Sequence, residues 1–176
     1  LLRLWKGRFT IRIRALPARL VRNTTLSKSD VRDYFMTSAI DHSNYPDAYL
    51  KQILTEVKTI ALVGASPRED RDSYRCMQAL LEQGYRVYPV NRREAGNQIL
   101  GQHCYADLAS LKVALDQPIH MVDIFRSSDA ALAVTEEAIA IGATVVWMQL
   151  EIVNDRAAQL AEAAGIKVVM NRCPKI

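Results

Sequence analysis

The stretch that decides the fold is residues 59–67, Thr-Ile-Ala-Leu-Val-Gly-Ala-Ser-Pro. Its first five residues form a short apolar run that is rich in β-branched side chains, which is typical of a buried strand. Gly64 follows at the point where such a strand must turn, and a glycine there lets the backbone bend sharply and lets another group come close to it. The stretch therefore predicts a buried strand that ends in a tight turn.

Helical and strand patterns alternate on both sides of this strand. Apolar positions recur at helical spacing in some segments, and short continuous apolar runs separate them. We expect helices at 48–57, from Ser73 to Gly84, at 107–114, from Ser127 or Ser128 to about 141, and from Asn154 to Gly165, and strands at 59–63, 85–90, 120–125, 143–148 and 166–170, with 91–105 as a loop.

Strands that alternate with helices predict a parallel sheet that is covered on both faces. Right-handed crossovers then favour an α/β, Rossmann-like, doubly wound sheet of five parallel strands, with strand order 3-2-1-4-5. Ligands of such sheets bind outside the carboxyl ends of the strands. This rule selects the segments 64–74, 91–101, 125–129 and 148–154 as candidate binding loops.

The charge of the chain is unevenly distributed. Residues 1–35 carry nine Lys or Arg and two Asp, whereas the rest of the chain carries fourteen basic and seventeen acidic residues. We expect residues 1–35 to be a basic extension and residues 46–176 to be the binding domain. The extension has three interpretations: upstream sequence before a true initiator at Met36, a disordered basic arm, or an organelle transit peptide. The mildly acidic remainder argues against a nucleic-acid partner.

Metal and nucleophile signatures are not found in the sequence. The three cysteines form no C-x-x-C pair and the three histidines are scattered, so we expect no metal site and no catalytic residue, in a reducing, cytoplasmic compartment. Ser66 is not part of a G-x-S-x-G elbow. No apolar run approaches the ~18 residues of a membrane span, so we expect no membrane partner.

The loop after the first strand has features of a phosphate site. Gly64 and Ala65 allow close approach to the main chain, Ser66 offers a hydroxyl and an N–H, and Pro67 stiffens the turn. The helix that follows would direct unpaired N–H groups towards an anion. The second and third glycines of the G-x-G-x-x-G pattern are missing, so a simple tight turn is the alternative interpretation.

The end of the second strand reads Asn91-Arg92-Arg93. NAD sites usually have an acidic residue here for the ribose hydroxyl, and this chain has two guanidinium groups instead. Because arginine binds phosphate in a bidentate manner, the pair favours a phosphorylated ribose, as in coenzyme A or NADP. A solvated charged loop is the alternative, and Glu94 could neutralise one arginine.

Two further strand ends supply candidate contacts. Phe125 could pack on adenine or pantetheine, and Arg126 could meet a phosphate. After the fourth strand, Gln149 is the candidate for a polar ligand contact, whereas we expect Trp147 to lie in the core.

Taken together, these segments resemble the small CoA-binding proteins whose single domain is similar to the N-terminal domain of the succinyl-CoA synthetase alpha subunit. The resemblance runs from about residue 50 onward and rests on the order of Thr-Ile-Ala-Leu-Val-Gly-Ala-Ser (59–66), Arg-Asp-Ser-Tyr-Arg (71–75), Leu-Gly (100–101), Met-Val-Asp-Ile-Phe-Arg (121–126), Val-Trp-Met-Gln-Leu (146–150) and Arg-Cys-Pro (172–174). It implies that residues 64–67 contact the pyrophosphate or ribose, that Asn91 and its neighbours flank the adenosine, and that Phe125 and Arg126 line the groove near the pantetheine.

Three positions depart from the pattern of this family. Arg92 stands where a proline usually follows the asparagine, Glu151 where a glycine is frequent, and Asn171 where an aspartate is usual. Glu151 adds bulk and negative charge near an anionic ligand, which makes contacts at that edge the least secure.

The resemblance implies a non-catalytic module that binds coenzyme A or acyl-CoA as a small-molecule ligand. Two alternatives remain open: an NADP-dependent oxidoreductase-like domain, and the CoA-binding subunit of an acyl-CoA ligase that acts in trans.

Overall fold

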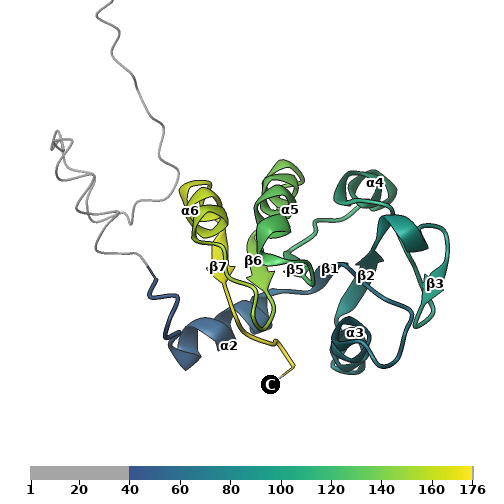
Figure 1. Cartoon of the computed structure of the whole chain (residues 1–176), viewed down its shortest axis with the longest axis horizontal. Helices are drawn as coiled ribbons and strands as arrows, with labels where there is room; N and C mark the ends of the chain where they lie inside the picture. Colours follow the sequence, from purple (N-terminus) through teal and green to yellow (C-terminus); the bar gives the residue numbers. More distant parts are fainter. Residues whose placement is uncertain (1–39, 176) are drawn as a thin grey trace, which may run out of the picture. The chain divides into compact units, whose positions relative to one another are not determined.

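The computed structural model describes residues 40–175, so the expectations for residues 1–35 lie outside the described part of the chain. Figure 1 labels most of the elements. In chain order they are α2 (Asp47–Glu56), β1 (Thr59–Val63), α3 (Asp72–Glu82), β2 (Arg86–Val90), the 3-10 helix η1 (Arg92–Glu94), β3 (Gln98–Ile99), β4 (Gln102–His103), α4 (Leu108–Ala114), β5 (Met121–Ile124), α5 (Ser128–Ala140), β6 (Val145–Met148), α6 (Asp155–Ala163) and β7 (Lys167–Val169).

Five of the strands form a parallel sheet in the order β2-β1-β5-β6-β7. Beyond β2, Tyr105 forms a single parallel bridge with Val90. When the Tyr105 bridge is counted as the third strand along the chain, β5 and β6 become the fourth and fifth strands. The sheet then has the expected order 3-2-1-4-5, with β7 beyond β6. Counted by the predicted strands alone, the third strand, at 120–125, lies beside the first. The direction of winding reverses between β1 and β5.

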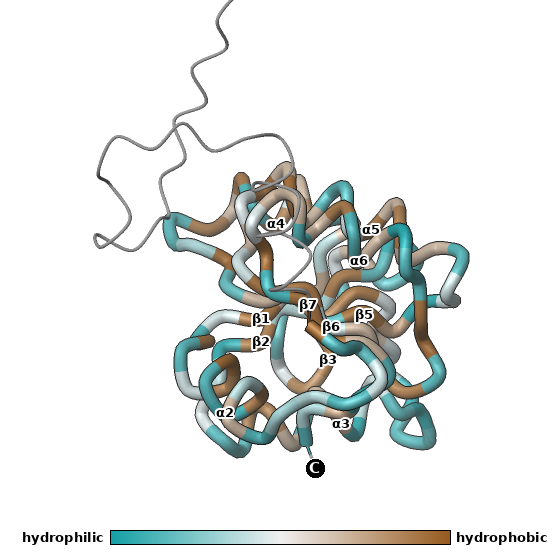
Figure 2. The backbone as a smooth tube through the Cα atoms, turned by 90° about the vertical axis from the view of Figure 1, so that its left-hand side faces the viewer, coloured by the Kyte–Doolittle hydropathy of each residue, from teal (hydrophilic) through white to brown (hydrophobic). Residues whose placement is uncertain are grey.

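Helices cover the sheet on both faces, as predicted. Helices α2 and α3 lie on one face, and α4, α5 and α6 lie on the other (Figure 1). Figure 2 shows hydrophobic residues concentrated in the central strands, whereas hydrophilic residues are frequent in the outer helices and loops. Because β5 and β6 are covered on both faces, all their residues are buried, which is why they appear in the sequence as continuous apolar runs rather than alternating ones.

The helix ends match the sequence in part. Asn154 caps α6, because its Oδ1 accepts a hydrogen bond from the Ala157 N–H at 2.9 Å. Ser73 does not cap α3: the N-cap is Arg71, and Ser73 is buried within the first turn. Ser127 occupies the N-cap of α5 without a side-chain bond. Ser128 instead accepts a hydrogen bond from the Val153 N–H at 3.1 Å, which ties α5 to the loop after β6.

The segment 91–105, expected as a loop, contains η1 and the small β3–β4 hairpin. In each strand of the hairpin only two residues pair, which is too few to produce a recognisable hydrophobic alternation.

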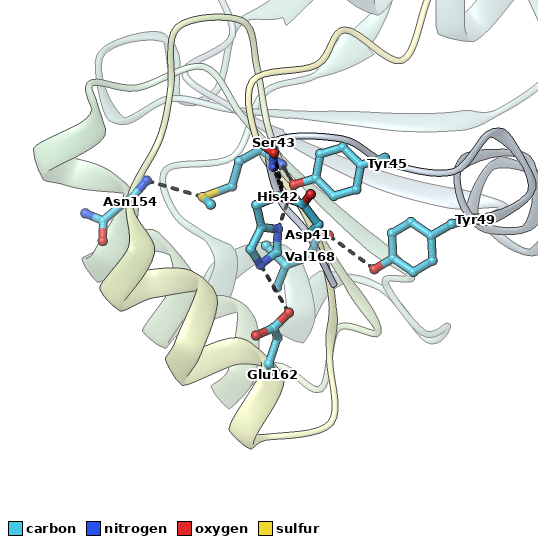
Figure 3. A network of polar contacts seen from close by, with 9 residues as sticks. Asp41, His42, Ser43, Tyr45, Tyr49, Asn154, Glu162 and Val168 are labelled. Atoms are coloured by element: carbon cyan, nitrogen blue, oxygen red, sulfur yellow. Dashed lines mark hydrogen bonds and ion pairs between the residues drawn. The ribbon is translucent and has the colours of Figure 1, made fainter. Parts of the chain in front are cut away.

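The segment before α2 is held against β7 by a network of polar contacts (Figure 3). The buried Tyr45 hydroxyl accepts a hydrogen bond from the Met170 N–H at 2.7 Å and is bonded to His42 Nδ1 at 2.7 Å. His42 Nε2 lies 3.2 Å from a carboxylate oxygen of Glu162 on α6, and the Tyr49 hydroxyl donates to the Val168 carbonyl at 3.1 Å. Residues 41–49 are thus anchored at the β7 edge of the sheet.

None of the helices within residues 40–175 is both long enough and apolar enough to cross a membrane.

Candidate ligand-binding site

Three neighbouring cavities lie along the carboxyl-end rim of the sheet, around the ends of β1 and β5, whose following helices α3 and α5 lie on opposite faces. The large cavity, of about 560 Å³, opens towards α4 and α5. The turn cavity, of about 350 Å³, lies at the start of α3, and the thiol cavity, of about 430 Å³, lies between α3 and the segment after β7. Gly64 and Asn91 line the first two, Phe125 the last two, and Arg126 the first and third. The shared walls make the rim one extended candidate region for a ligand.

Gly64 brings the first and third candidate loops, 64–74 and 125–129, close together. Its φ of +91° lies in the left-handed region, and a Cβ at this position would overlap the Phe125 carbonyl oxygen. A glycine is therefore required for the β5–α5 loop to pass this close to the turn. The Gly64 N–H is already used, since it donates to the Val90 carbonyl at 2.9 Å.

The rest of the turn presents main-chain donors to the turn cavity. Ala65 and Ser66 line it together with the first residues of α3, and among residues 40–175 no acceptor is found for the Ala65 or Ser66 N–H. The Ser66 Oγ accepts from the Arg68 N–H at 3.3 Å, which shapes the turn. Pro67 is exposed and does not line this cavity. The donor set suits an oxyanion at the N-terminus of α3.

Asn91 fixes the geometry at the end of β2. Its Nδ2 donates to the Ala65 carbonyl at 2.7 Å, and its Oδ1 accepts from the Arg93 N–H at 3.0 Å. The first contact joins the β2 end to the glycine turn, and the second begins η1. The Asn91 side chain therefore positions both loops.

Arg92, Arg93 and Arg126 surround the large cavity as exposed side chains. Within the described residues none of the three has a carboxylate within ion-pair distance, whereas Arg68 and Arg75 are paired with Asp70 and Asp72. Glu94 does not neutralise the arginines: its carboxylate accepts from Asn97 Nδ2 at 3.3 Å.

The other side of the large cavity contains two acids and an apolar wall. The pKa of Asp107 is held below its usual range by hydrogen bonds from the Ser110 N–H and hydroxyl, with a smaller effect of Arg92. Glu137 lies on α5, and Val63, Val90, Ala130 and Val134 supply the apolar surface. The cavity thus offers an apolar wall beside three cations, which suits an aromatic group that carries phosphates.

Phe125 and Gln149 border the thiol cavity, but they differ in what they can do. Phe125, in the β5–α5 loop, is half-buried and lines the cavity. Gln149 is only 4% exposed, and its Nε2 donates to Asp123 Oδ1 at 2.8 Å. Because the Gln149 Nε2 already donates to Asp123, the predicted polar contact with a ligand is limited to the remaining atoms of the Gln149 amide.

Asp123 is the residue that the sequence reasoning missed as a site residue. It lies on β5, is fully buried, and contacts Gln149 and Cys76. Burial raises the pKa of Asp123 to about 7, and the hydrogen bond from Gln149 opposes this rise. An acid inside the apolar run of residues 120–125 was the available signal, because a buried carboxyl is costly unless it has partners.

Three further residues that the sequence analysis singled out lie at this edge of the sheet. Trp147 lies in the core, 1% exposed, and its Nε1–H donates to the Arg172 carbonyl at 2.7 Å. Glu151 and Asn171, two of the positions that depart from the family pattern, both have positive φ, and the Asn171 Oδ1 accepts from the Glu151 N–H at 2.9 Å. The two unusual residues thus stabilise each other's loops.

Comparisons with known proteins agree with this geometry. The family described as the CoA binding domain matches residues 58–176. An uncharacterized protein of Bacillus subtilis, YneT, is 35% identical over 76% of this chain and 94% of its own. A hypothetical protein from Pyrococcus horikoshii has a solved structure that is 38% identical and covers 78% of this chain and 92% of its own, with a TM-score of 0.68. A protein from Thermus thermophilus is 34% identical over 73% of this chain and 93% of its own, with a TM-score of 0.67.

Proposed function

The chain belongs to the CoA-binding domain family, and from this premise we propose that it binds coenzyme A or an acyl-CoA at the rim without acyl or phosphoryl transfer. The observation that carries the proposal is the set of three unpaired guanidinium groups around the large cavity: Arg92, Arg93 and Arg126. Guanidinium groups bind phosphate through parallel N–H donors, and coenzyme A presents a phosphorylated ribose and a pyrophosphate.

We assign the parts of the ligand to the three cavities. The adenine and its phosphorylated ribose occupy the large cavity, with Arg92 and Arg93 near the 3′-phosphate and Asn91 flanking the adenosine. The pyrophosphate lies at residues 64–66 and the N-terminus of α3, because free N–H groups and the helix dipole favour an anion there. The pantetheine extends past Phe125 and Arg126 towards Gln149.

The absence of acyl or phosphoryl transfer is part of the proposal, and two contacts support it. The Ser66 hydroxyl oxygen accepts a hydrogen bond from the Arg68 N–H, and within the described residues no side chain that could act as a general base is hydrogen-bonded to it. His103 is exposed, packs edge-on against Tyr105 at 4.8 Å between ring centroids, and lines none of the three rim cavities.

The direct test compares two ligands on a paired variant. Replacing Arg92 and Arg93 together by Gln should weaken coenzyme A binding by about tenfold or more, since a charge-assisted contact is worth ~1.5–3 kcal/mol. Dephospho-CoA, which lacks the 3′-phosphate, should lose much less in isothermal titration calorimetry.

Arg156→Gln on α6 is the matched control, because Arg156 is exposed and does not line the rim cavities. It should leave both affinities unchanged. Equal losses for coenzyme A and dephospho-CoA in the paired variant would defeat the assignment of these arginines.

Two other functions use the same observation. In an NADP-dependent oxidoreductase-like domain, Arg92 and Arg93 would hold the 2′-phosphate of NADP. In an acyl-CoA ligase that acts in trans, the chain would supply the coenzyme site to a nucleotide-binding partner. A thermal-shift panel of CoA, acetyl-CoA, NADP, NAD and ATP separates the first from our proposal, and co-purification of a partner would favour the second.

A further inference from the structure

Two cysteines from distant parts of the chain meet at the thiol cavity. Cys76 lies on α3 and is buried, whereas Cys173 lies in the segment after β7 and is half-buried. Both line the cavity of about 430 Å³ next to Phe125 and Arg126. The Cys173 thiol is close enough to contribute to the raised pKa of the Cys76 thiol, after burial and Asp123.

A buried polar cluster lies directly behind Cys76. The Cys76 thiol contacts Asp123 Oδ2 at 3.9 Å, and Gln149 Nε2 approaches the Cys76 sulfur at 3.8 Å while it donates to Asp123 Oδ1. A fully buried carboxyl is costly, and phosphate binding at the rim gives it no role. With a pKa of about 7, the Asp123 carboxyl can both accept and return a proton near neutral pH.

The two thiols differ as expected for a reacting pair. Cys173 lines the cavity and lies outside any helix or strand. Its thiol can therefore react with a small molecule in the cavity and then move towards Cys76. Cys76 is inert towards solvent but has a proton acceptor beside it. Arg126 and Lys175 line the same cavity and stabilise a thiolate that leaves.

We propose that Cys173 and Cys76 form a dithiol exchange site that reduces the disulfide of coenzyme A. This inference rests on the proposed function for its choice of disulfide, because the thiol end of the ligand would lie in this cavity. It goes beyond binding, since it assigns a redox reaction to side chains that the phosphate contacts do not use.

The reaction balances in two exchange steps. The Cys173 thiolate attacks one sulfur of the small disulfide, which forms a mixed disulfide and releases the first thiol after it takes a proton from water. Cys76 then gives its proton to the Asp123 carboxylate and attacks the Cys173 sulfur. A Cys76–Cys173 disulfide forms, and the second thiolate leaves with the proton from Asp123. The protein dithiol has lost two electrons, and the small disulfide has become two thiols.

The test uses the full chain, pre-reduced, freed of reductant and incubated with CoA disulfide. Intact-mass measurement and peptide mapping should find a Cys76–Cys173 link and two released thiols per chain. Cys173→Ser should lose the reaction, and Cys76→Ala should accumulate the mixed disulfide at Cys173. Asp123→Asn should slow the second step and leave the first unchanged.

Cys104→Ser is the matched control and should react like the wild type. Cys104 is buried away from the thiol cavity, with its sulfur 3.7 Å from the Asn91 carbonyl oxygen. An adduct on Cys104, or a Cys76→Ala variant that carries no adduct, would overturn the proposal. The same incubation is repeated with glutathione disulfide in place of CoA disulfide. Equal rates of thiol release from the two disulfides would overturn the assignment of the site to coenzyme A.

Calorimetry with coenzyme A on the same sample separates the two proposals. If the protein binds coenzyme A but keeps all three thiols after exposure to CoA disulfide, the exchange site is wrong and the proposed function stands. Exchange without measurable binding of coenzyme A means that the proposed function is wrong, and with it the choice of substrate.

Discussion

Single residues decide how the rim is built. Gly64 allows the turn after β1 to touch the β5–α5 loop, and Asn91 joins the same turn to the end of β2. Asp123 and Gln149 are buried behind the thiol cavity and satisfy each other. The residues that shape the site are therefore distinct from the exposed arginines that we expect to bind the ligand.

Asp123 makes the stability of the protein depend on pH. Its pKa of about 7 lies above the ~3.9 of an exposed aspartate, so the folded state binds the proton more tightly than the unfolded state. This contribution to stability is complete below pH ~4, falls as the pH rises towards 7, and is lost above 7, with a total on the order of 4 kcal/mol. Asp123→Asn should flatten this part of the curve in urea unfolding from pH 4 to 8.

The difference between wild type and variant is the quantity to measure, because every other ionisable group is common to the two proteins. Asp116→Asn, in an exposed loop, should keep the wild-type slope. A variant curve parallel to that of the wild type would show that Asp123 is not a protonated buried carboxyl.

Elements of regular structure follow closely from the sequence where burial is continuous. β1 has the predicted bounds, and the other four strands of the parallel sheet lie within the predicted ranges. A strand buried on both faces appears as an unbroken apolar run, which fixes its position. Elements with a few paired residues, such as β3 and β4, leave no such pattern, and the start of α3 differs because periodicity places a helix only to within about a turn.

The site could be predicted as far as it depends on strand ends. Residues 64–66, 91–93 and 125–126 meet at the rim because the carboxyl ends of parallel strands lie together. The cluster of Asp123, Gln149 and Cys76 could not be predicted, because a continuous apolar run does not show which face of the sheet each side chain takes. The contact between Cys76 and Cys173 depends on the path of the chain after β7, which has no local signature.

The contact between the segment before α2 and β7 should contribute measurably to stability. Tyr45→Phe removes the acceptor of the buried Met170 N–H, which should cost ~1–3 kcal/mol because that donor is left unsatisfied. Urea unfolding should show the loss as a lower midpoint with an unchanged slope. Figure 3 shows the contacts that the substitution would break.

Tyr74→Phe on α3 is the control, since Tyr74 is half-buried and its hydroxyl has no hydrogen-bond partner within residues 40–175. It should shift the free energy of unfolding by less than ~0.5 kcal/mol. Equal effects of the two substitutions would mean that the Tyr45 hydroxyl does not anchor this segment.

At the scale of the whole described domain, the doubly wound topology gathers four kinds of group at one rim. Main-chain donors come from the β1–α3 turn, cations from the ends of β2 and β5, an apolar wall from α5, and thiols from α3 and the segment after β7. These segments are far apart in sequence and meet because the winding reverses between β1 and β5. One ligand with phosphates at one end and sulfur at the other matches this arrangement.

The central claim is that this rim binds coenzyme A through its phosphorylated adenosine. Calorimetric titration of the full chain with coenzyme A, with dephospho-CoA as the paired ligand, tests it most directly. We predict saturable binding at one site per chain, with tighter binding of coenzyme A than of dephospho-CoA. No binding of coenzyme A at millimolar concentration, or equal affinity for both ligands, would contradict it.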